Sequence, residues 1–236
     1  LQALFADLDD AAKTVSAIIG SGIVPATLEL IDKVILGVIN DYGGAEFSED
    51  VEALLLIEVD GEERSVAGQG ERIERFCRER GAIDVQRAAT IEEGEKLWHA
   101  RRTAFGAVAR LRPNCIVEDA TVPVKRLPEM IRKVVELSEK YHLKIGVLAH
   151  AGDGNLHPLI MTDLKDKEEM ARVDKAMDEL YEAAIGMGGT LSGEHGIGIA
   201  KDRFMPMEFN ESALDIMRGI KGVFDPNNIL NPGGFL

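Results

Sequence analysis

Two short stretches of the sequence carry side chains that could bind a catalytic metal. His150 and His157 bracket a Gly-Asp-Gly turn in the stretch HAGDGNLHP, residues 150–158. Glycine permits a sharp reversal, so a chain leaving the apolar stretch 146–149 can return with the second imidazole beside the first. The spacing favours two strand ends joined by a tight loop over neighbouring turns of one helix, which need three or four residues.

The third ligand is expected in the stretch SGEHGIG, residues 192–198, where glycines flank Glu194 and His195. Two histidines and one glutamate with a coordination position left open are typical of a catalytic metal site. The plainer reading makes His150 and His157 two imidazoles that flank a turn and bind nothing. The Gly-Asp-Gly segment is expected to form a turn, with Asp153 as a turn residue and not a ligand. This role is compatible with both a metal site and two unbound imidazoles.

Composition excludes several classes of partner. The 236 residues carry a formal net charge of −14, so a nucleic acid or an anionic membrane surface is an unsuitable partner. The sequence shows no apolar run of membrane-spanning length and no signal-peptide pattern, and we expect a cytoplasmic protein. Cys77 and Cys115 are the two cysteines and are expected to be reduced thiols.

Hydrophobic periodicity, capping residues and turn residues predict alternating strands and helices. In the first third, this alternation predicts an α+β fold of ferredoxin-like type, an antiparallel sheet covered on one face by helices. We find no internal repeat in the sequence and no linker, and therefore expect one domain, residues 1–236. The expected strands are 1–8, 26–31, 53–59, 82–89, 115–122, 143–149 and 159–161. The expected helices are 11–20, 32–40, 64–80, 91–108, 126–141, 165–187 and 211–223.

Three motifs in order along the chain carry a family resemblance: residues 150–158, residues 193–198 (GEHGIG) and residues 224–233 (FDPNNILNPG). Together they resemble the C-terminal half of the FAD-linked oxidases, in the glycolate oxidase and D-lactate dehydrogenase branch of the vanillyl-alcohol oxidase superfamily. The resemblance covers nearly the whole chain. It implies the FAD-linked oxidase C-terminal fold, a substrate or cap domain whose N-terminal FAD-binding domain lies outside these residues.

The same resemblance implies roles for individual residues. A divalent metal, zinc or else manganese or iron, would be held by His150, His157 and Glu194. His195 would be the general base that takes the substrate's hydroxyl proton. Arg101 would clamp the carboxylate of the substrate, a task that suits a guanidinium, although a solvated helix face is the default for it.

The resemblance also implies partners outside the metal site. Asn231, in a tail that returns to the flavin domain in relatives, would lie on the FAD side. The expected partners are a small 2-hydroxy-monocarboxylate, an FAD-binding domain or subunit, and an electron-acceptor subunit. A face made to meet the flavin domain would leave an apolar patch exposed, through which the chain could self-associate.

The function implied is the substrate- and metal-binding half of an FAD-dependent 2-hydroxyacid dehydrogenase, with the isolated chain inactive. Two alternatives stay open from the residues. One is a non-catalytic metal-binding or assembly module that docks on a separate flavoprotein. The other is a metal-dependent hydrolase, although the sequence has no His-Glu-x-x-His helix.

Overall fold

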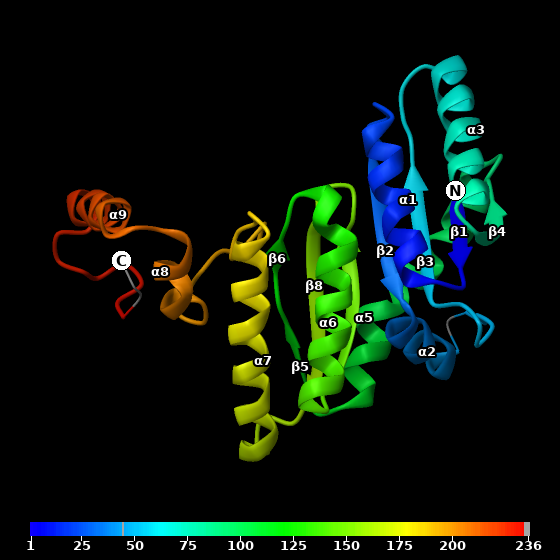
Figure 1. Cartoon of the computed structure of the whole chain (residues 1–236). Helices are drawn as coiled ribbons and strands as arrows, with labels where there is room; N and C mark the ends of the chain where they lie inside the picture. Colours follow the sequence, from blue (N-terminus) through cyan, green and yellow to red (C-terminus); the bar gives the residue numbers. More distant parts are fainter. Residues whose placement is uncertain (44, 234–236) are drawn as a thin grey trace.

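The structure is a computed structural model that describes residues 1–43 and 45–233. Its centre is one eight-stranded sheet in which every pairing of neighbouring strands is antiparallel. Helices pack against the sheet (Figure 1), which confirms the predicted α+β class.

The first half of the sheet has ferredoxin-like topology. Its strands lie in the order β4-β1-β3-β2, as expected when two strand–helix–strand units interleave. An additional helix, α2, lies between β2 and β3 along the chain. The elements of this half are β1 (Gln2–Phe5), α1 (Leu8–Gly20), β2 (Thr27–Asp32), α2 (Lys33–Tyr42), β3 (Ala53–Glu58), α3 (Glu63–Glu79) and β4 (Ala82–Gln86).

The second half of the sheet repeats this strand order. Its strands lie in the order β7-β8-β5, which matches β2-β3-β1 of the first half, and β6 also pairs with β8. The topology therefore contains a repeat that the sequence did not reveal. The elements are α4 (Ile91–Leu97), α5 (His99–Leu111), β5 (Asn114–Val117), β6 (Ala120–Thr121), η1 (Val124–Arg126), α6 (Leu127–Tyr141), β7 (Lys144–His150), β8 (Asn155–Thr162) and α7 (Lys167–Gly186).

The two halves meet where β2 pairs with β7. In this pairing Glu29 lies opposite His150, and Ile31 lies opposite Leu148. The first predicted metal ligand therefore lies at the junction of the two halves.

Helices cover both faces of the sheet, and not one face as the sequence suggested. Side chains of α1, α3, α6 and α7 belong to one hydrophobic core, and side chains of α2 and α5 belong to a second core on the opposite face. Strand β3 contributes to both, with Leu55 in the first core and Leu54 in the second. Its continuous apolar run is explained by burial on both faces.

Three predicted elements have different limits in the structure. The helix expected over 91–108 is divided at Trp98 into α4 and α5. The strand expected over 115–122 is interrupted at Glu118 and Asp119. Helix α1 begins at Leu8, because the Asp7 side chain accepts the first free backbone N–H groups.

The C-terminal segment lies apart from the sheet, beyond α7 (Figure 1). It contains η2 (Asp202–Phe204), α8 (Met205–Glu208) and α9 (Glu211–Phe224). Large apolar side chains of α9 and the following tail are exposed, namely Ile216, Ile220, Val223, Phe224, Ile229 and Leu230. An exposed apolar surface was expected; self-association through it stays a prediction. In the described part of the chain, no helix is long and apolar enough to span a membrane.

Candidate functional site

The three predicted metal ligands converge on one point. One potential ligand atom from each of His150, His157 and Glu194 lies within 4.8 Å of the others. The Oε1 atom of Glu194 is 3.0 Å from Nε2 of His157 and 3.6 Å from Nε2 of His150. The two imidazole rings meet edge to face, with their centroids 5.2 Å apart.

Strand register explains why the two histidines meet. Strand β7 ends at His150, and the chain turns and pairs back on itself, so that His157 lies opposite Leu148. Side chains two residues apart on a strand share a face. Leu148 and Leu159 belong to the α2/α5 core, so both histidines face that side of the sheet. The tight loop between strand ends was predicted, and His157 lies inside β8, two residues beyond its start.

The histidine atoms that face Glu194 fit a metal. Nε2 of His157 is buried and makes no hydrogen bond with any described residue, although Oε1 of Glu194 lies 3.0 Å away. An unpaired polar atom is costly in a protein interior. Its Nδ1 atom lies 3.3 Å from the carbonyl oxygen of Glu118, which can accept an N–H from the ring. Burial lowers the pKa of His157, which favours the neutral ring that a metal requires, although the Glu118 carbonyl opposes this.

Glu29 connects the first histidine to the predicted substrate clamp. Its buried carboxylate lies 2.5 Å from Nδ1 of His150 through Oε1, and accepts an N–H from Nε of Arg101 at 2.9 Å through Oε2. Among the described residues, the terminal nitrogens of Arg101 have no hydrogen-bond partner. A guanidinium held by Nε can still present those nitrogens to a carboxylate.

Asp119 fixes the loop that carries Glu194. Its carboxylate accepts the hydroxyl of Ser192 at 2.5 Å and the backbone N–H groups of Gly193, Glu194 and His195 at 3.1, 3.0 and 2.8 Å. Burial alone would raise the pKa of Asp119, but these four hydrogen bonds outweigh burial and hold the pKa well below its usual range. The loop is therefore wrapped around an ionised carboxylate.

The buried side chain of Lys201 also holds the loop that carries Glu194. The ammonium of Lys201 donates to the carbonyl oxygens of Asp119 and Leu191 at 2.8 and 3.1 Å. It lies 3.9 Å from the carboxylate of Glu118, which also accepts the hydroxyl of Tyr181. Burial lowers the pKa of Lys201, while the carboxylates of Glu118 and Asp119 act in the opposite direction.

His195 lies next to the three predicted metal ligands without belonging to their group. Its Nε2 atom is 3.8 Å from Oε1 of Glu194, and its ring stacks on His157 at a centroid distance of 4.9 Å. The side chain is 41% exposed, so a small substrate could reach it. Asn231, in contrast, lies in the exposed tail after α9 and is not part of the cluster that the described residues form.

Two cavities adjoin the cluster. One of about 170 Å³ is bordered by Glu29, His150 and residues 24–28. Another of about 430 Å³ lies beside Glu194 and is lined by Met205, Phe209 and Met217. Each cavity therefore leaves room beside one predicted ligand, His150 or Glu194.

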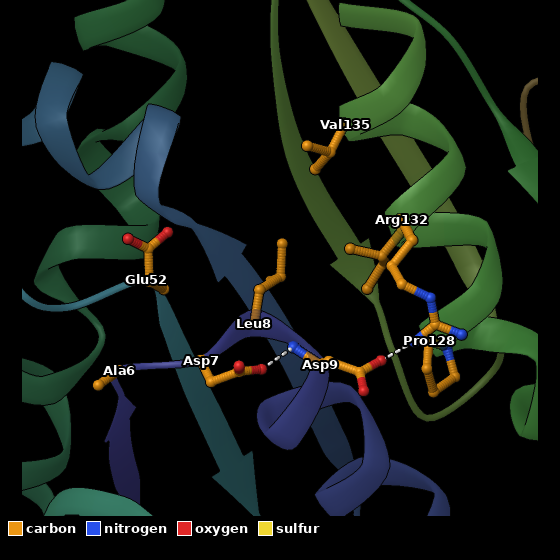
Figure 2. Close-up of a pocket in the computed structure, with 9 residues that line it drawn as sticks. Ala6, Asp7, Leu8, Asp9, Glu52, Pro128, Arg132 and Val135 are labelled. Carbon is orange, nitrogen blue, oxygen red and sulfur yellow. Dashed lines mark hydrogen bonds and ion pairs between the residues drawn. The ribbon is translucent and has the colours of Figure 1, made fainter. Parts of the chain in front are cut away.

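A further cavity of about 440 Å³ shares no lining residue with the cluster. It lies between the start of α1 and the side of α6 (Figure 2). There Arg132 pairs with Asp9, and the carboxylates of Asp7 and Glu52 line the same space. The charged side chains of this lining are three carboxylates and one arginine, a set poorly suited to a carboxylate substrate.

Sequence reasoning missed Glu29 and Asp119 as parts of the site. The signal for Glu29 was a carboxylate in the middle of an otherwise apolar strand, TLELID. A buried carboxylate needs a charged or hydrogen-bonding partner, so its position deserved a role. For Asp119, the signal was the acidic pair that interrupts the strand expected over 115–122.

Comparison with known proteins agrees with this architecture. The family "FAD linked oxidases, C-terminal domain" matches residues 1–234. The chain is 46% identical to the glycolate oxidase subunit GlcD of Bacillus subtilis, over 99% of this chain and 50% of that protein. It is 32% identical to the mitochondrial D-lactate dehydrogenase [cytochrome] of Arabidopsis thaliana, over 97% of this chain and 40% of that protein. The chain thus spans about half the length of the curated relatives it matches.

Solved structures share the fold at low sequence identity. A p-cresol methylhydroxylase crystal structure with substrate bound superposes with a TM-score of 0.70 at 17% identity, covering 99% of this chain and 52% of that one. A 4-ethylphenol oxidase structure from Gulosibacter chungangensis superposes with a TM-score of 0.66 at 13% identity. The match covers 99% of this chain and 52% of that one. Together with the family match over residues 1–234, these findings establish that the chain belongs to the C-terminal domain family of the FAD-linked oxidases.

Proposed function

We propose that this chain is the substrate- and metal-binding half of an FAD-dependent 2-hydroxyacid dehydrogenase of the glycolate or D-lactate type. One domain, residues 1–236, would provide the substrate side, and an FAD-binding domain or subunit would provide the flavin. An electron-acceptor subunit is a further proposed partner. The cytoplasmic location expected from the composition stays a prediction.

The observation that carries the proposal is the convergence of His150, His157 and Glu194. The buried Nε2 of His157, which forms no hydrogen bond with the described residues, supports a metal ligand in place of a packing histidine. The names of the relatives, glycolate oxidase and D-lactate dehydrogenase, support a small 2-hydroxyacid as substrate. Membership of a flavin-linked oxidase family favours redox chemistry over metal-dependent hydrolysis.

The chain's own residues would divide the work between binding and proton transfer. The terminal nitrogens of Arg101 would hold the substrate carboxylate in a bidentate pair. His195 would accept the proton of the 2-hydroxyl on a ring nitrogen, because its ring is exposed and adjoins the three ligands. Glu194 would serve as a ligand while its loop stays fixed by Asp119.

Two groups outside the chain would complete the chemistry. A divalent ion held by the two histidines and Glu194 would supply Lewis acidity toward the substrate's hydroxyl and carboxylate oxygens. FAD, bound mainly by the partner domain, would supply the acceptor for the hydride from C2. Zinc is the proposed ion, since two imidazoles and one carboxylate suit it, and manganese or iron would be accepted by the same donors.

The test is elemental analysis for zinc, manganese and iron on the purified chain after incubation with each ion and gel filtration. The wild-type chain should retain close to one equivalent, and His157→Ala should lose most of it. His99→Ala is the matched control, because His99 is exposed and lies outside the cluster. Equal and negligible metal in all three proteins would refute the metal site.

The substrate class has a separate test. Combined with an FAD-binding partner, the protein should reduce an artificial electron acceptor with glycolate or D-lactate, and Arg101→Lys should raise KM for the acid at least tenfold. Lysine keeps the charge and loses the bidentate geometry. Absence of turnover with every 2-hydroxyacid tried would contradict the proposed reaction while leaving the metal result intact.

A further inference from the structure

We infer that Glu29 is a positioning residue that orients the metal-facing histidine and the substrate-binding arginine together. This inference rests on the proposed function, and it adds a residue that neither the family motifs nor the metal cluster contain. Glu29 itself would touch neither metal nor substrate. Its role would be to act through His150 and Arg101.

The contacts of Glu29 are divided between these two residues. Oε1 lies 2.5 Å from Nδ1 of His150, and Oε2 lies 2.9 Å from Nε of Arg101. The Glu29 side chain is only 4% exposed, so water cannot replace either partner cheaply. One carboxylate therefore fixes two side chains that come from different elements, β7 and α5.

The direction of the hydrogen bonds selects one form of His150. Arginine stays protonated, and its Nε can only donate, so Glu29 meets Arg101 as an acceptor. A carboxylate oxygen that faces Nδ1 of His150 also accepts, which places the ring proton on Nδ1. The lone pair then lies on Nε2, the atom that faces Glu194 at 3.6 Å.

His157 is arranged in the same way by a different acceptor. Its Nδ1 atom faces the carbonyl oxygen of Glu118, and its Nε2 atom faces Glu194 at 3.0 Å. Both histidines therefore have an acceptor on Nδ1 and a bare Nε2 toward the same carboxylate. Metal-binding histidines commonly have such an outer acceptor, which sets the tautomer and the ring orientation.

The position of Glu29 in the fold makes the coupling rigid. It is directly opposite His150 in the pairing of β2 with β7, where the two halves of the sheet join. Arg101 is near the start of α5, which packs on this face of the sheet. The proposed metal ligand His150 and the proposed substrate-binding residue Arg101 are thus linked through the single buried side chain of Glu29.

Glu29→Gln is a specific test because an amide cannot satisfy both neighbours. If its oxygen faces Arg101, its NH₂ group faces His150 and favours the opposite tautomer, with the proton on Nε2. If its oxygen faces His150, its NH₂ group meets the N–H of Arg101, and the arginine is displaced. Size is retained in both cases, so cavity effects stay small.

The experiment has two readouts on the chain. Long-range ¹H–¹⁵N NMR of the metal-free chain at pH 8 reports the tautomer of His150, and competition with a chromophoric chelator reports the affinity for Zn²⁺. We expect the Nδ1–H form in the wild type and a shift toward the Nε2–H form in Glu29→Gln. The Zn²⁺ affinity of this variant should fall about 10- to 100-fold.

Glu169→Gln is the matched control. Glu169 is also a mostly buried carboxylate paired with an arginine, Arg112 at 2.6 Å, but it touches no histidine. This variant should lose thermal stability as Glu29→Gln does, and keep the His150 tautomer and the Zn²⁺ affinity.

Several results would overturn the inference. An Nε2–H tautomer of His150 in the wild type would do so, even if Glu29→Gln fails to fold. An unchanged tautomer and unchanged Zn²⁺ affinity in a folded Glu29→Gln would do so as well, if the KM for the acid, measured with an FAD-binding partner, is also unchanged and Arg101 is therefore still in place. If the wild type binds no Zn²⁺, the proposed function fails, and the tautomer measurement still decides the role of Glu29.

Discussion

The carboxylate of Asp119 accepts the backbone N–H of His195 at 2.8 Å. The two residues are separated by 76 positions in the chain, yet this contact and its neighbours fix the loop that carries the proposed ligand Glu194 and the proposed base His195. The chemistry of the site therefore depends on a buried residue that takes no direct part in it.

Removal of this carboxylate should loosen the loop. We expect Asp119→Ala to lower the free energy of unfolding by about 3 kcal/mol, because several N–H groups lose a charged acceptor. Asp119→Asn should cost less, since one amide oxygen can still serve the three donors that now meet Oδ2, from Ser192, Glu194 and His195. Urea unfolding and zinc titration measure both effects, and zinc affinity should fall in the same order.

Asp166→Ala provides the control for Asp119. Asp166 accepts the backbone N–H groups of Glu168 and Glu169 at the start of α7, away from the site. Its loss should cost stability without changing zinc affinity. A zinc affinity in Asp119→Ala equal to that of the wild type would show that the loop holds its shape without the carboxylate.

Asp32 should make the protein less stable as pH rises from about 4 to about 7. Burial raises the pKa of Asp32 to about 7, against the hydrogen bonds that its carboxylate accepts from the N–H groups of Ile35 and Val147. The folded chain then holds this proton more tightly than the unfolded chain, whose aspartates titrate near 4. The contribution of Asp32 to the free energy of unfolding is fully present below about pH 4. It decreases as pH rises toward 7, by up to about 1.4 kcal/mol per pH unit.

Asp32→Asn tests this pH dependence. Asparagine can still cap α2, because its oxygen can accept the N–H of Ile35, but it has no proton to lose. The variant should therefore be more stable than the wild type above pH 7, with a flatter slope between pH 4 and 7 in urea unfolding. Parallel slopes for the two proteins would mean that Asp32 titrates normally in the folded state.

Cys77 should be inert toward thiol reagents in the folded protein. Cys77 is fully buried, and burial raises its pKa to about 12, so little thiolate exists at pH 8. In Cys115→Ser, which leaves Cys77 alone, labelling by a chromogenic disulfide should be at least about 100-fold slower than in the denatured chain. Labelling at the denatured rate would show that α3 opens readily.

The local pattern of the sequence predicted much of the fold. The apolar run of β3 and the capped, amphipathic helices follow from propensity and periodicity over short windows. The glycine-flanked motifs indicated which histidines and glutamate would meet, and the structure brings His150, His157 and Glu194 together. Each of these signals lies within a few residues of the position that it describes.

What escaped prediction depends on pairing between distant segments. Glu29 meets His150 across 121 positions, through the register of β2 against β7. The second layer of helices could not be inferred either, because a strand buried on both faces lacks the alternation that would reveal each face. A buried carboxylate on an apolar strand marks a site, but its partner is set only by the register.

Two glycines, Gly152 and Gly154, lie between the proposed metal ligands His150 and His157. Gly154 has a φ of +73°, and a Cβ added there would lie 2.0 Å from the carbonyl oxygen of Val122. Gly154→Ala should therefore lower the free energy of unfolding by about 2–4 kcal/mol and weaken zinc binding, since the turn must open to relieve the clash.

Gly152 offers a control inside the same turn. A Cβ added at Gly152 would meet Leu28 Cβ at 3.4 Å, an ordinary contact, and its φ lies outside the positive region. Gly152→Ala should thus change stability by less than about 1 kcal/mol and leave zinc affinity intact. Thermal unfolding and zinc titration should be measured for both variants. They compare Gly154, whose positive φ and close approach to Val122 require glycine, with Gly152, where a larger residue fits. Equal losses in both would mean that flexibility of the whole turn, and not the approach of Gly154 to Val122, brings His150 and His157 together.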